Sequence, residues 1–368
     1  MFDSSWTALS PGSMMNEKVQ GPAVSAVIPC RNEREHIEDC LESVLAQEPV
    51  PGGFEIVVAD GMSDDGTREV LSRYAEKDAR LRVIDNPERI VSAAMNAGIL
   101  SARGRFIALM GAHNRYAPDY LRACLQVSEE TGADNVGGSM VCEGNSWLQR
   151  AIAIAHHSPF SAGGARWHNP YYEGPADTVF GGFYRREVFE RVGMFDETLV
   201  RNQDDEFNLR LTRAGGTIWH SPRIKSWYRP RASLKALFFQ YLQYGYWKVR
   251  VIQKHRLPAS VRHLVPGGFV ACVLALAFGA PFFPAARWLS GAVLGAYASA
   301  NFAVSLLTAA RRGWEFLPAL PLVFACYHFG YGIGFLRGVL DFIVLGRAPS
   351  FTFTRLTRSS ASELEKTC

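Results

Sequence analysis

Polar side chains follow two apolar runs in the N-terminal part of the chain. The run Val24–Ile28 leads into Asn32 and Glu33, and the run Phe54–Ala59 leads into Asp60. Both runs have the length and composition of buried strands. Because the carboxyl ends of parallel strands form the crevice where ligands bind in an open α/β sheet, we expect these three polar side chains to meet a nucleotide there.

A second group of carboxylates lies much later in the chain. Asp204, Asp205 and Glu206 precede an apolar pattern that predicts a helix through Leu211. The dipole at a helix start favours an ionised carboxylate, and an ionised carboxylate can take a proton from an attacking hydroxyl group. These three carboxylates are therefore candidates for a general base, and a purely helix-capping role remains open.

The elements that position these groups alternate along the chain. Further short strands are predicted at Leu81–Ile84 and Arg105–Met110, and amphipathic helices separate the four strands. The β-α-β-α order is typical of a Rossmann-like, mainly parallel sheet with helices on both faces. The predicted fold class is therefore α/β, followed by a helical transmembrane region.

Composition excludes some classes of partner and compartment. The formal net charge of +4 is small for 368 residues, so nucleic acid is not an expected partner. The seven cysteines include no CxxC pair or zinc-like spacing, which is typical of reduced core thiols in the cytosol. The first twenty residues lack the apolar segment of a cleavable secretory signal.

The C-terminal part contains three apolar stretches, near 264–284, 288–310 and 316–336. Each is about the 20 residues that a helix needs to cross a bilayer. Basic residues gather just before them, between Arg223 and Arg262, which favours the anionic cytoplasmic leaflet. We expect a multi-pass protein of the cytoplasmic membrane with its catalytic domain in the cytoplasm. The third stretch either crosses or forms a re-entrant or interfacial helix, and a buried soluble helical domain is the alternative to all three.

These patterns divide the chain into four predicted parts. They are a flexible N-terminal arm at 1–21, a catalytic domain at 22–262, membrane-embedded helices at 263–346 and a basic C-terminal tail at 347–368.

Several motifs together resemble family 2 glycosyltransferases with a GT-A fold. The resemblance spans roughly 22–250, and its successive motifs are Val24–Glu33, Val57–Thr67, Gly104–Asn114, Phe180–Phe195 and Asn202–Gly216. The tract Ala155–Tyr171, followed by Asp177-Thr178-Val179, is similar to the succinoglycan biosynthesis branch, which carries C-terminal membrane helices. The resemblance implies inverting transfer of a sugar from a nucleotide diphosphate, usually with a divalent metal.

The resemblance also implies a donor site. Asp60 matches the aspartate that binds the base and ribose, and its carboxylate could accept the imide N–H of uracil, so a UDP-sugar is the expected donor. Glu33 either accepts a ribose hydroxyl or caps a helix. The full set of expected donor contacts is Pro29, Asn32, Glu33, Asp60, Asn96 and Gly111.

The expected metal site departs from the family pattern. The branch carries Asp-x-His after the fourth strand, whereas this chain has Gly111-Ala112-His113. His113 is the remaining candidate ligand for Mg²⁺ or Mn²⁺ or for the diphosphate, and an ordinary loop histidine is the alternative. Arginine or lysine could neutralise the diphosphate instead.

On the acceptor side, Asp204 matches the position of the family's catalytic base. The expected acceptor contacts are Asp177, Gly181, Gly182 and Asp205. The predicted acceptor is a lipid-linked glycan in cell-surface polysaccharide synthesis, with other polysaccharide-assembly proteins as further partners. Two alternatives stay open: transfer directly to a polyprenyl phosphate, and a non-catalytic scaffold that binds a nucleotide or glycan.

Overall fold

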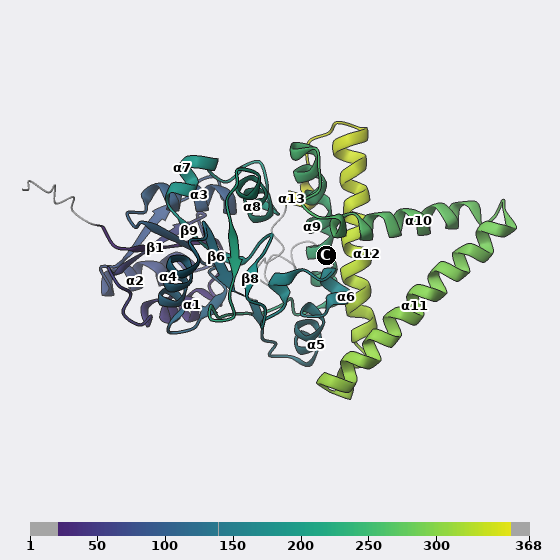
Figure 1. The fold of residues 1–368 in the computed structure, drawn as a ribbon, viewed down its shortest axis with the longest axis horizontal. Helices are drawn as coiled ribbons and strands as arrows, with labels where there is room; N and C mark the ends of the chain where they lie inside the picture. The colour runs from purple at the N-terminus through teal and green to yellow at the C-terminus, as the bar shows by residue number, and fades with distance from the viewer. Residues whose placement is uncertain (1–20, 139, 355–368) are drawn as a thin grey trace, which may run out of the picture.

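A computed structural model describes residues 21–138 and 140–354. Their N-terminal part contains an eight-stranded sheet, shown in Figure 1. In spatial order its strands are β3 (Leu81–Asp85), β2 (Phe54–Asp60), β1 (Val24–Cys30), β4 (Phe106–Leu109), β9 (Phe180–Arg185), β6 (Asn135–Gly138), β10 (Ile218–His220) and β8 (Gly174–Pro175). Strands β3, β2, β1 and β4 are parallel neighbours, while β9 and β8 run against their partners. The predicted mainly parallel sheet is confirmed.

Helices cover both faces of this sheet because the side chains of its strands alternate. Val24, Ala26 and Ile28 of β1 enter one apolar core, and Val27 enters the other. The first core is closed by α1 (Ile37–Leu45), α2 (Thr67–Lys77) and α4 (Tyr120–Thr131). The second is closed by α3 (Val91–Ser101), α7 (Glu187–Val192) and α8 (Gln203–Arg213), which Figure 1 shows on the opposite side.

A smaller sheet and several short helices connect the large sheet to the C-terminal helices. The small sheet has the order β5 (Asn114–Tyr116), β11 (Ser226–Tyr228), β7 (Met140–Cys142). In sequence, its strand β7 is followed by α5 (Trp147–His156), α6 (Pro159–Ala162) and a 3-10 helix at Arg166–His168. A capping box formed by Ser146 and Gln149 fixes the start of α5.

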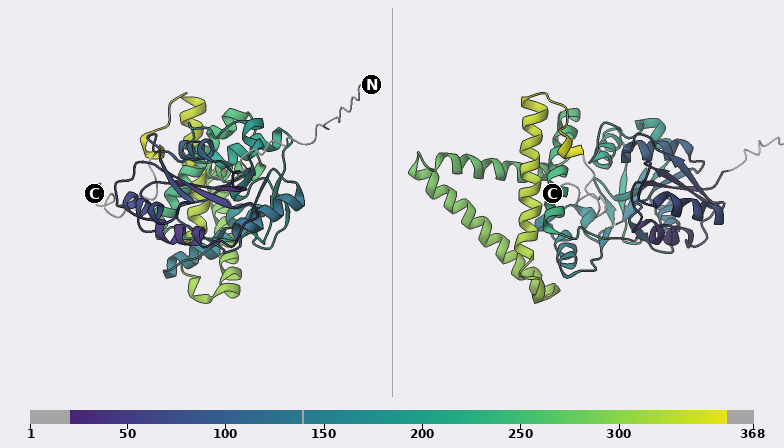
Figure 2. Two further views of the ribbon diagram at one scale, coloured as in Figure 1. Left: turned by 90° about the vertical axis from the view of Figure 1, so that its left-hand side faces the viewer. Right: turned by 180° about the vertical axis from the view of Figure 1, so that it is seen from behind.

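The C-terminal helices lie together on one side of the sheet domain (Figures 1 and 2). They are α9 (Leu234–His255), α10 (Val265–Gly279), α11 (Pro284–Arg312), α12 (Leu320–Gly338) and the short α13 (Phe351–Thr354), with 3-10 helices at Val261–His263 and Trp314–Phe316 and a π-helix at Val339–Val344. Figures 1 and 2 show α10 and α11 projecting away from the sheet as a hairpin, while α12 lies across the base of that hairpin.

Glycines allow α12 to approach α9 until the two backbones touch. A Cβ atom at Gly334 would lie 1.9 Å from the carbonyl oxygen of Leu242. One turn to either side, Cβ atoms at Gly330 and Gly338 would lie 2.9 and 2.7 Å from α9 carbonyl oxygens. Such small-residue spacing permits close helix packing, so no larger side chain fits along this contact.

The described residues contain two helices long and apolar enough to cross a membrane, Val261–Gly279 and Pro284–Arg312. Only 11% and 17% of their most apolar windows are buried, so they are not core helices. The third apolar stretch differs: within α12, Leu320 and Phe324 are fully buried against α5 and α9. The predicted domain bounds stay a prediction. Most of the predicted N-terminal arm and C-terminal tail, residues 1–20 and 355–368, lies outside the described residues.

We predict that Gly334→Leu destabilises the protein by about 2 kcal/mol or more, because the added side chain must push α9 and α12 apart. Gly295→Leu is the matched control, since a Cβ there meets nothing within 4 Å. Thermal unfolding of both variants in detergent measures the effect. Equal melting temperatures would contradict the close contact.

Candidate active site

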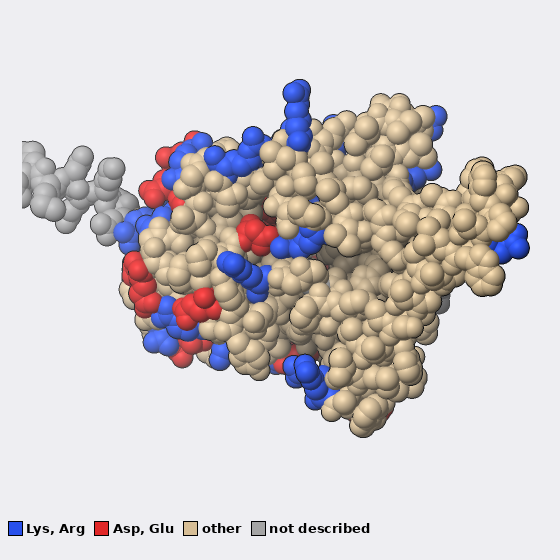
Figure 3. Space-filling view, turned by 45° about the vertical axis from the view of Figure 1, so that its right-hand side comes forward, with Lys and Arg blue, Asp and Glu red and all other residues tan. Residues whose placement is uncertain are grey.

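A cavity of about 920 Å³ lies between the carboxyl ends of β1 and β4 and the C-terminal helices. Glu33 and Gly111 contribute from the strand ends, Asp204 from the start of α8, and Tyr241 and Tyr327 from α9 and α12. Figure 3 shows the molecule hollowed where these parts meet, with acidic and basic side chains beside the opening. The predicted crevice is therefore closed on one side by helices.

The loops that follow β1 and β4 are joined by Glu33 and His113. The Nδ1 atom of His113 lies 3.1 Å from Oε1 of Glu33, and both residues line the cavity. A carboxylate that accepts the Nδ1 proton leaves Nε2 as the basic nitrogen, an arrangement typical of metal-binding histidines. Spacing in the sequence gives no sign of this pair, whose members lie 80 residues apart.

Gly111 occupies the position of the missing acid, and the surrounding structure is adapted to the glycine. A Cβ atom there would lie 2.6 Å from Nδ2 of Asn114, which is buried. Among the described residues, no group of three or more His, Cys, Asp or Glu side chains could hold a metal ion. His113, supported by Glu33, nevertheless fits an ion whose remaining ligands are diphosphate oxygens, as hard cations in such sites often have few protein ligands.

Asp60 lies at the end of β2, but its carboxylate is fully buried and does not line the cavity. It accepts hydrogen bonds from the hydroxyl of Ser63 at 2.6 Å and from Nη1 of Arg68 at 3.0 Å. Arg68 also contacts Asp85 at 2.8 Å. A donor base would have to reach Asp60 by displacing Arg68 or by binding beside it, and its role stays a prediction.

The other predicted donor contacts divide into two groups. Pro29, like Glu33 and Gly111, lines the cavity. Asn32 does not: it has a left-handed φ of 51°, and its amide exchanges two hydrogen bonds with Asp64. Asn96 is buried in α3 and donates to the carbonyl of Phe195 at 2.9 Å, so it ties that helix to the loop after α7.

The two aspartates at the start of α8 differ in their electrostatic surroundings. Asp205 forms an ion pair with Lys248, whose side chain is only 5% exposed. Burial alone would raise the pKa of the Asp205 carboxyl. The positive charge of Lys248 outweighs this effect and lowers the pKa below its usual range. The side chain of Asp204 is exposed to the cavity, but the protein that surrounds the cavity and then the charge of Asp205 raise the pKa of Asp204 to about 6. The expected helix start is confirmed, but enclosure outweighs the helix dipole that should hold this pKa low.

This difference selects among the three candidate bases. Asp204 lines the cavity, and its Oδ1 atom accepts the backbone N–H of Asp205 at 2.9 Å. Asp205 is already neutralised by Lys248. Glu206 is fully buried and bound by Arg210 and Lys254 at 2.8 and 2.9 Å. Asp204 is therefore the carboxylate best placed and most basic for proton removal.

The predicted acceptor residues on β9 and before it also take different positions. Gly181 lines the cavity with a φ of 78°. Gly182 has a φ of 86°, and a Cβ there would lie 2.4 Å from the ring of Tyr184. Asp177 does not line the cavity but forms an ion pair with Arg262, at the start of the helical hairpin. Its contact anchors the hairpin to the sheet domain.

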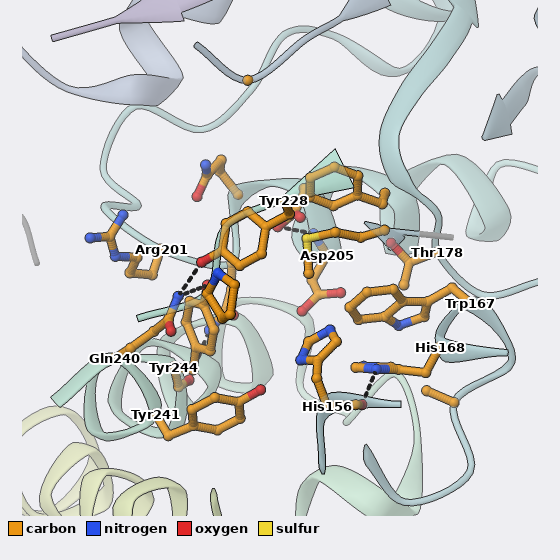
Figure 4. Close-up of a pocket in the computed structure, with 18 of the residues that line it drawn as sticks. His156, Trp167, His168, Thr178, Arg201, Asp205, Tyr228, Gln240, Tyr241 and Tyr244 are labelled. Atoms are coloured by element: carbon orange, nitrogen blue, oxygen red, sulfur yellow. Dashed lines mark hydrogen bonds between the residues drawn. The ribbon is translucent and has the colours of Figure 1, made fainter. Parts of the chain in front are cut away.

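Aromatic residues that were not predicted as site residues line the rest of the cavity. Figure 4 shows Trp167, His168 and His156 facing Tyr228 and Tyr244 across a slot. Two sequence signals indicated this aromatic lining: the irregular tract between 133 and 179, rich in Gly, Trp, Tyr and His, and the aromatic segment 240–248, which contains Tyr241 and Tyr244. Figure 4 also shows Asp205 between the two walls.

Comparisons with known proteins agree with this architecture. The model of the family described as "Glycosyl transferase family 2" matches residues 25–193. The succinoglycan biosynthesis protein ExoA of Rhizobium meliloti (strain 1021) is 33% identical over 331 residues, which cover 89% of this chain and 98% of that protein. A relative from Methanococcus voltae is 26% identical over 324 residues, covering 86% and 97% of the two chains. It is named dolichyl N-acetyl-alpha-D-glucosaminyl phosphate 3-beta-D-2,3-diacetamido-2,3-dideoxy-beta-D-glucuronosyltransferase.

A solved structure supports the fold. The mannosyltransferase PcManGT from Pyrobaculum calidifontis, in complex with GDP-Man and Mn²⁺, superposes with a TM-score of 0.54 at 21% identity, over 83% of this chain and 86% of that one. The predicted GT-A fold is confirmed. Together with the near full-length match to the Rhizobium protein, these findings show that the chain belongs to glycosyl transferase family 2 and is a glycosyltransferase.

Proposed function

We propose that this chain transfers a sugar, with inversion, from a nucleotide-sugar to a lipid-linked glycan during the synthesis of a cell-surface polysaccharide. The observation that carries the proposal is the shared cavity: Asp204 faces the same space as the Glu33–His113 pair, and apolar helices border that space. Donor, base and an acceptor held at a membrane can therefore meet in one enclosed volume. Polysaccharide synthesis is supported by the Rhizobium relative.

The proposed mechanism is a single displacement. Asp204 removes the proton from an acceptor hydroxyl group as its oxygen attacks the anomeric carbon, and the nucleoside diphosphate leaves from the opposite side. With a pKa of about 6, roughly nine-tenths of the Asp204 side chains are ionised at pH 7. The base therefore combines ionisation at neutral pH with more basicity than an exposed aspartate has.

The donor diphosphate is assigned to the strand ends that carry His113 and Gly111. A divalent ion there would be held by Nε2 of His113, with Glu33 orienting the ring, and would neutralise charge on the diphosphate. The Mn²⁺ bound by the Pyrobaculum structure supports this assignment. Arg31, which also lines the cavity, provides a second positive charge. UDP remains our prediction for the nucleotide.

The acceptor is assigned to the helical side of the cavity. Phe269 of α10 and Tyr297 of α11 line the cavity, and both helices expose most of their apolar side chains. We propose that this hairpin inserts into the cytoplasmic membrane from its cytoplasmic face, which would bring a lipid carrier beside the site. The Methanococcus relative, whose name specifies a dolichyl phosphate-linked sugar as acceptor, supports a lipid-linked substrate.

Replacing the base tests this proposal. We predict that Asp204→Asn lowers kcat by about 10² to 10⁴-fold, because the amide cannot accept the acceptor proton. Asp205→Asn is the matched control and should retain more activity than Asp204→Asn. Release of nucleoside diphosphate in the presence of membrane acceptor measures the rate. A nearly silent Asp204→Asn would instead favour transfer to polyprenyl phosphate, whose anionic oxygen needs no base.

The pKa of Asp204 predicts the pH dependence. Because the ionised form is active, kcat/KM should fall below pH 6 by about tenfold per pH unit and level off above it. In Asp205→Asn the neighbouring negative charge is removed, so the midpoint should move to lower pH. Initial rates from pH 4.5 to 8.5 measure both curves. An unchanged midpoint in Asp205→Asn would show that another group controls the acidic limb.

A further inference from the structure

The aromatic slot beside Asp205 is built by elements other than the strand ends assigned to the donor. One wall contains His156 from α5 together with Trp167 and His168 from the 3-10 helix. The other contains Tyr228 from β11 and, from α9, the residues Tyr241 and Tyr244. Figure 4 shows the rings of the two walls on opposite sides of the space below Asp205.

Both walls are held in place by hydrogen bonds within the protein. Nδ1 of His168 lies 2.9 Å from the carbonyl oxygen of His156, and the rings of Trp167 and His168 have centroids 3.7 Å apart. Opposite them, Nε2 of Gln240 donates to the Tyr244 hydroxyl at 3.1 Å. The aromatic surfaces are therefore preorganised and do not depend on a ligand for their arrangement.

Among the described residues, Nε2 of His156 is a buried polar atom of this slot without a hydrogen-bond partner. Its imidazole is buried, and Nε2 makes no hydrogen bond within the described part of the chain. Burial, followed by the neighbouring His168 and His157, lowers the pKa of His156 well below its usual value, so the ring is neutral. A buried polar atom without a partner costs free energy, and native proteins keep few of them without a functional reason.

The aromatic faces and polar groups of the slot indicate what kind of ligand it can bind. Aromatic faces pack against the C–H face of a flat, saturated ring, and one or two polar groups fix its orientation. Asp205 is paired with Lys248, and the His156 ring is neutral, so neither of these two groups requires a charged ligand; Arg201 and Arg231 also line the cavity, near Tyr244. A pyranose combines a C–H face with hydroxyl groups and carries no charge.

We infer that this slot binds the terminal pyranose of the acceptor, with its ring between Trp167 and the tyrosine wall and a hydroxyl hydrogen-bonded to Nε2 of His156. His156 is then a positioning residue, which orients the sugar so that another hydroxyl faces Asp204. This inference rests on the proposed function and narrows the reacting end of the acceptor to a pyranose ring.

Saturation-transfer NMR tests the inference with the full chain in nanodiscs, whose lipids carry no sugar. The probes are methyl β-D-glucopyranoside and methyl β-D-galactopyranoside in the presence of UDP, with open-chain sorbitol as the ring-free control and farnesol as a lipid control. We expect at least one pyranoside to bind more tightly than sorbitol. Binding of farnesol alone, or of no probe, would overturn the inference.

Variants then locate the binding. His156→Phe should weaken pyranoside binding by about tenfold, while the melting temperature stays unchanged or rises because an unpaired polar atom has been removed. His156→Gln should restore most of the affinity, since its amide can again bond a hydroxyl. Trp167→Leu should also weaken binding by about tenfold. Tyr171→Leu, a change at an exposed ring outside the cavity lining, is the matched control.

UDP titration of the same samples separates two kinds of failure. If the wild-type protein binds UDP but no variant changes pyranoside affinity, the slot is not the sugar site and this inference alone is wrong. If the wild-type protein binds neither UDP nor GDP nor dTDP, the proposed function fails, and the inference fails with it. Should His156→Phe unfold, the Trp167→Leu result decides, because that side chain is only half-buried.

Discussion

Helices α9 and α12 approach each other until backbone meets backbone, and the rest of the site depends on this contact. At Gly334 even a single Cβ atom would overlap the carbonyl of Leu242. Because α9 also supplies Lys248 and, with Tyr241 and Tyr244, part of the tyrosine wall, its position decides whether the crevice at the strand ends is open or enclosed. In this protein the crevice is enclosed. The helix that encloses it, α9, packs on α12 at the base of the apolar hairpin.

Enclosure explains the electrostatics of the proposed base. In an open crevice, a carboxylate at a helix start would keep a low pKa. Here the surrounding protein and the charge of Asp205 raise the pKa of Asp204 to about 6. Asp205 itself forms an ion pair with Lys248. One buried cation therefore divides two adjacent aspartates into a paired group and a reactive group. The same enclosure leaves Nε2 of His156 buried, without a hydrogen-bond partner in the part of the chain that the structure describes.

Local sequence patterns predicted the four parallel strands β1 to β4 and the helices on both faces of the sheet, because alternation and amphipathic spacing follow directly from burial. They also placed Asp204 at a helix start. They did not predict the Glu33–His113 pair, the engagement of Asp60 by Arg68 or the packing of α12, since each is a tertiary contact between side chains or backbones distant in sequence. From the sequence, Gly111 indicated only that the family's acidic residue is missing. The structure shows that Asn114 fills the space that a side chain at this position would need.

Electron cryo-microscopy of the full chain in nanodiscs with bound UDP tests the central claim most directly, because it places the nucleotide, the base and the bilayer in one map. The account predicts nucleotide density beside His113, a continuous cavity from it past Asp204, and lipid density around α10 and α11 with α9 packed on α12. Nucleotide bound away from the strand ends, or a hairpin packed outside the bilayer, would contradict the account.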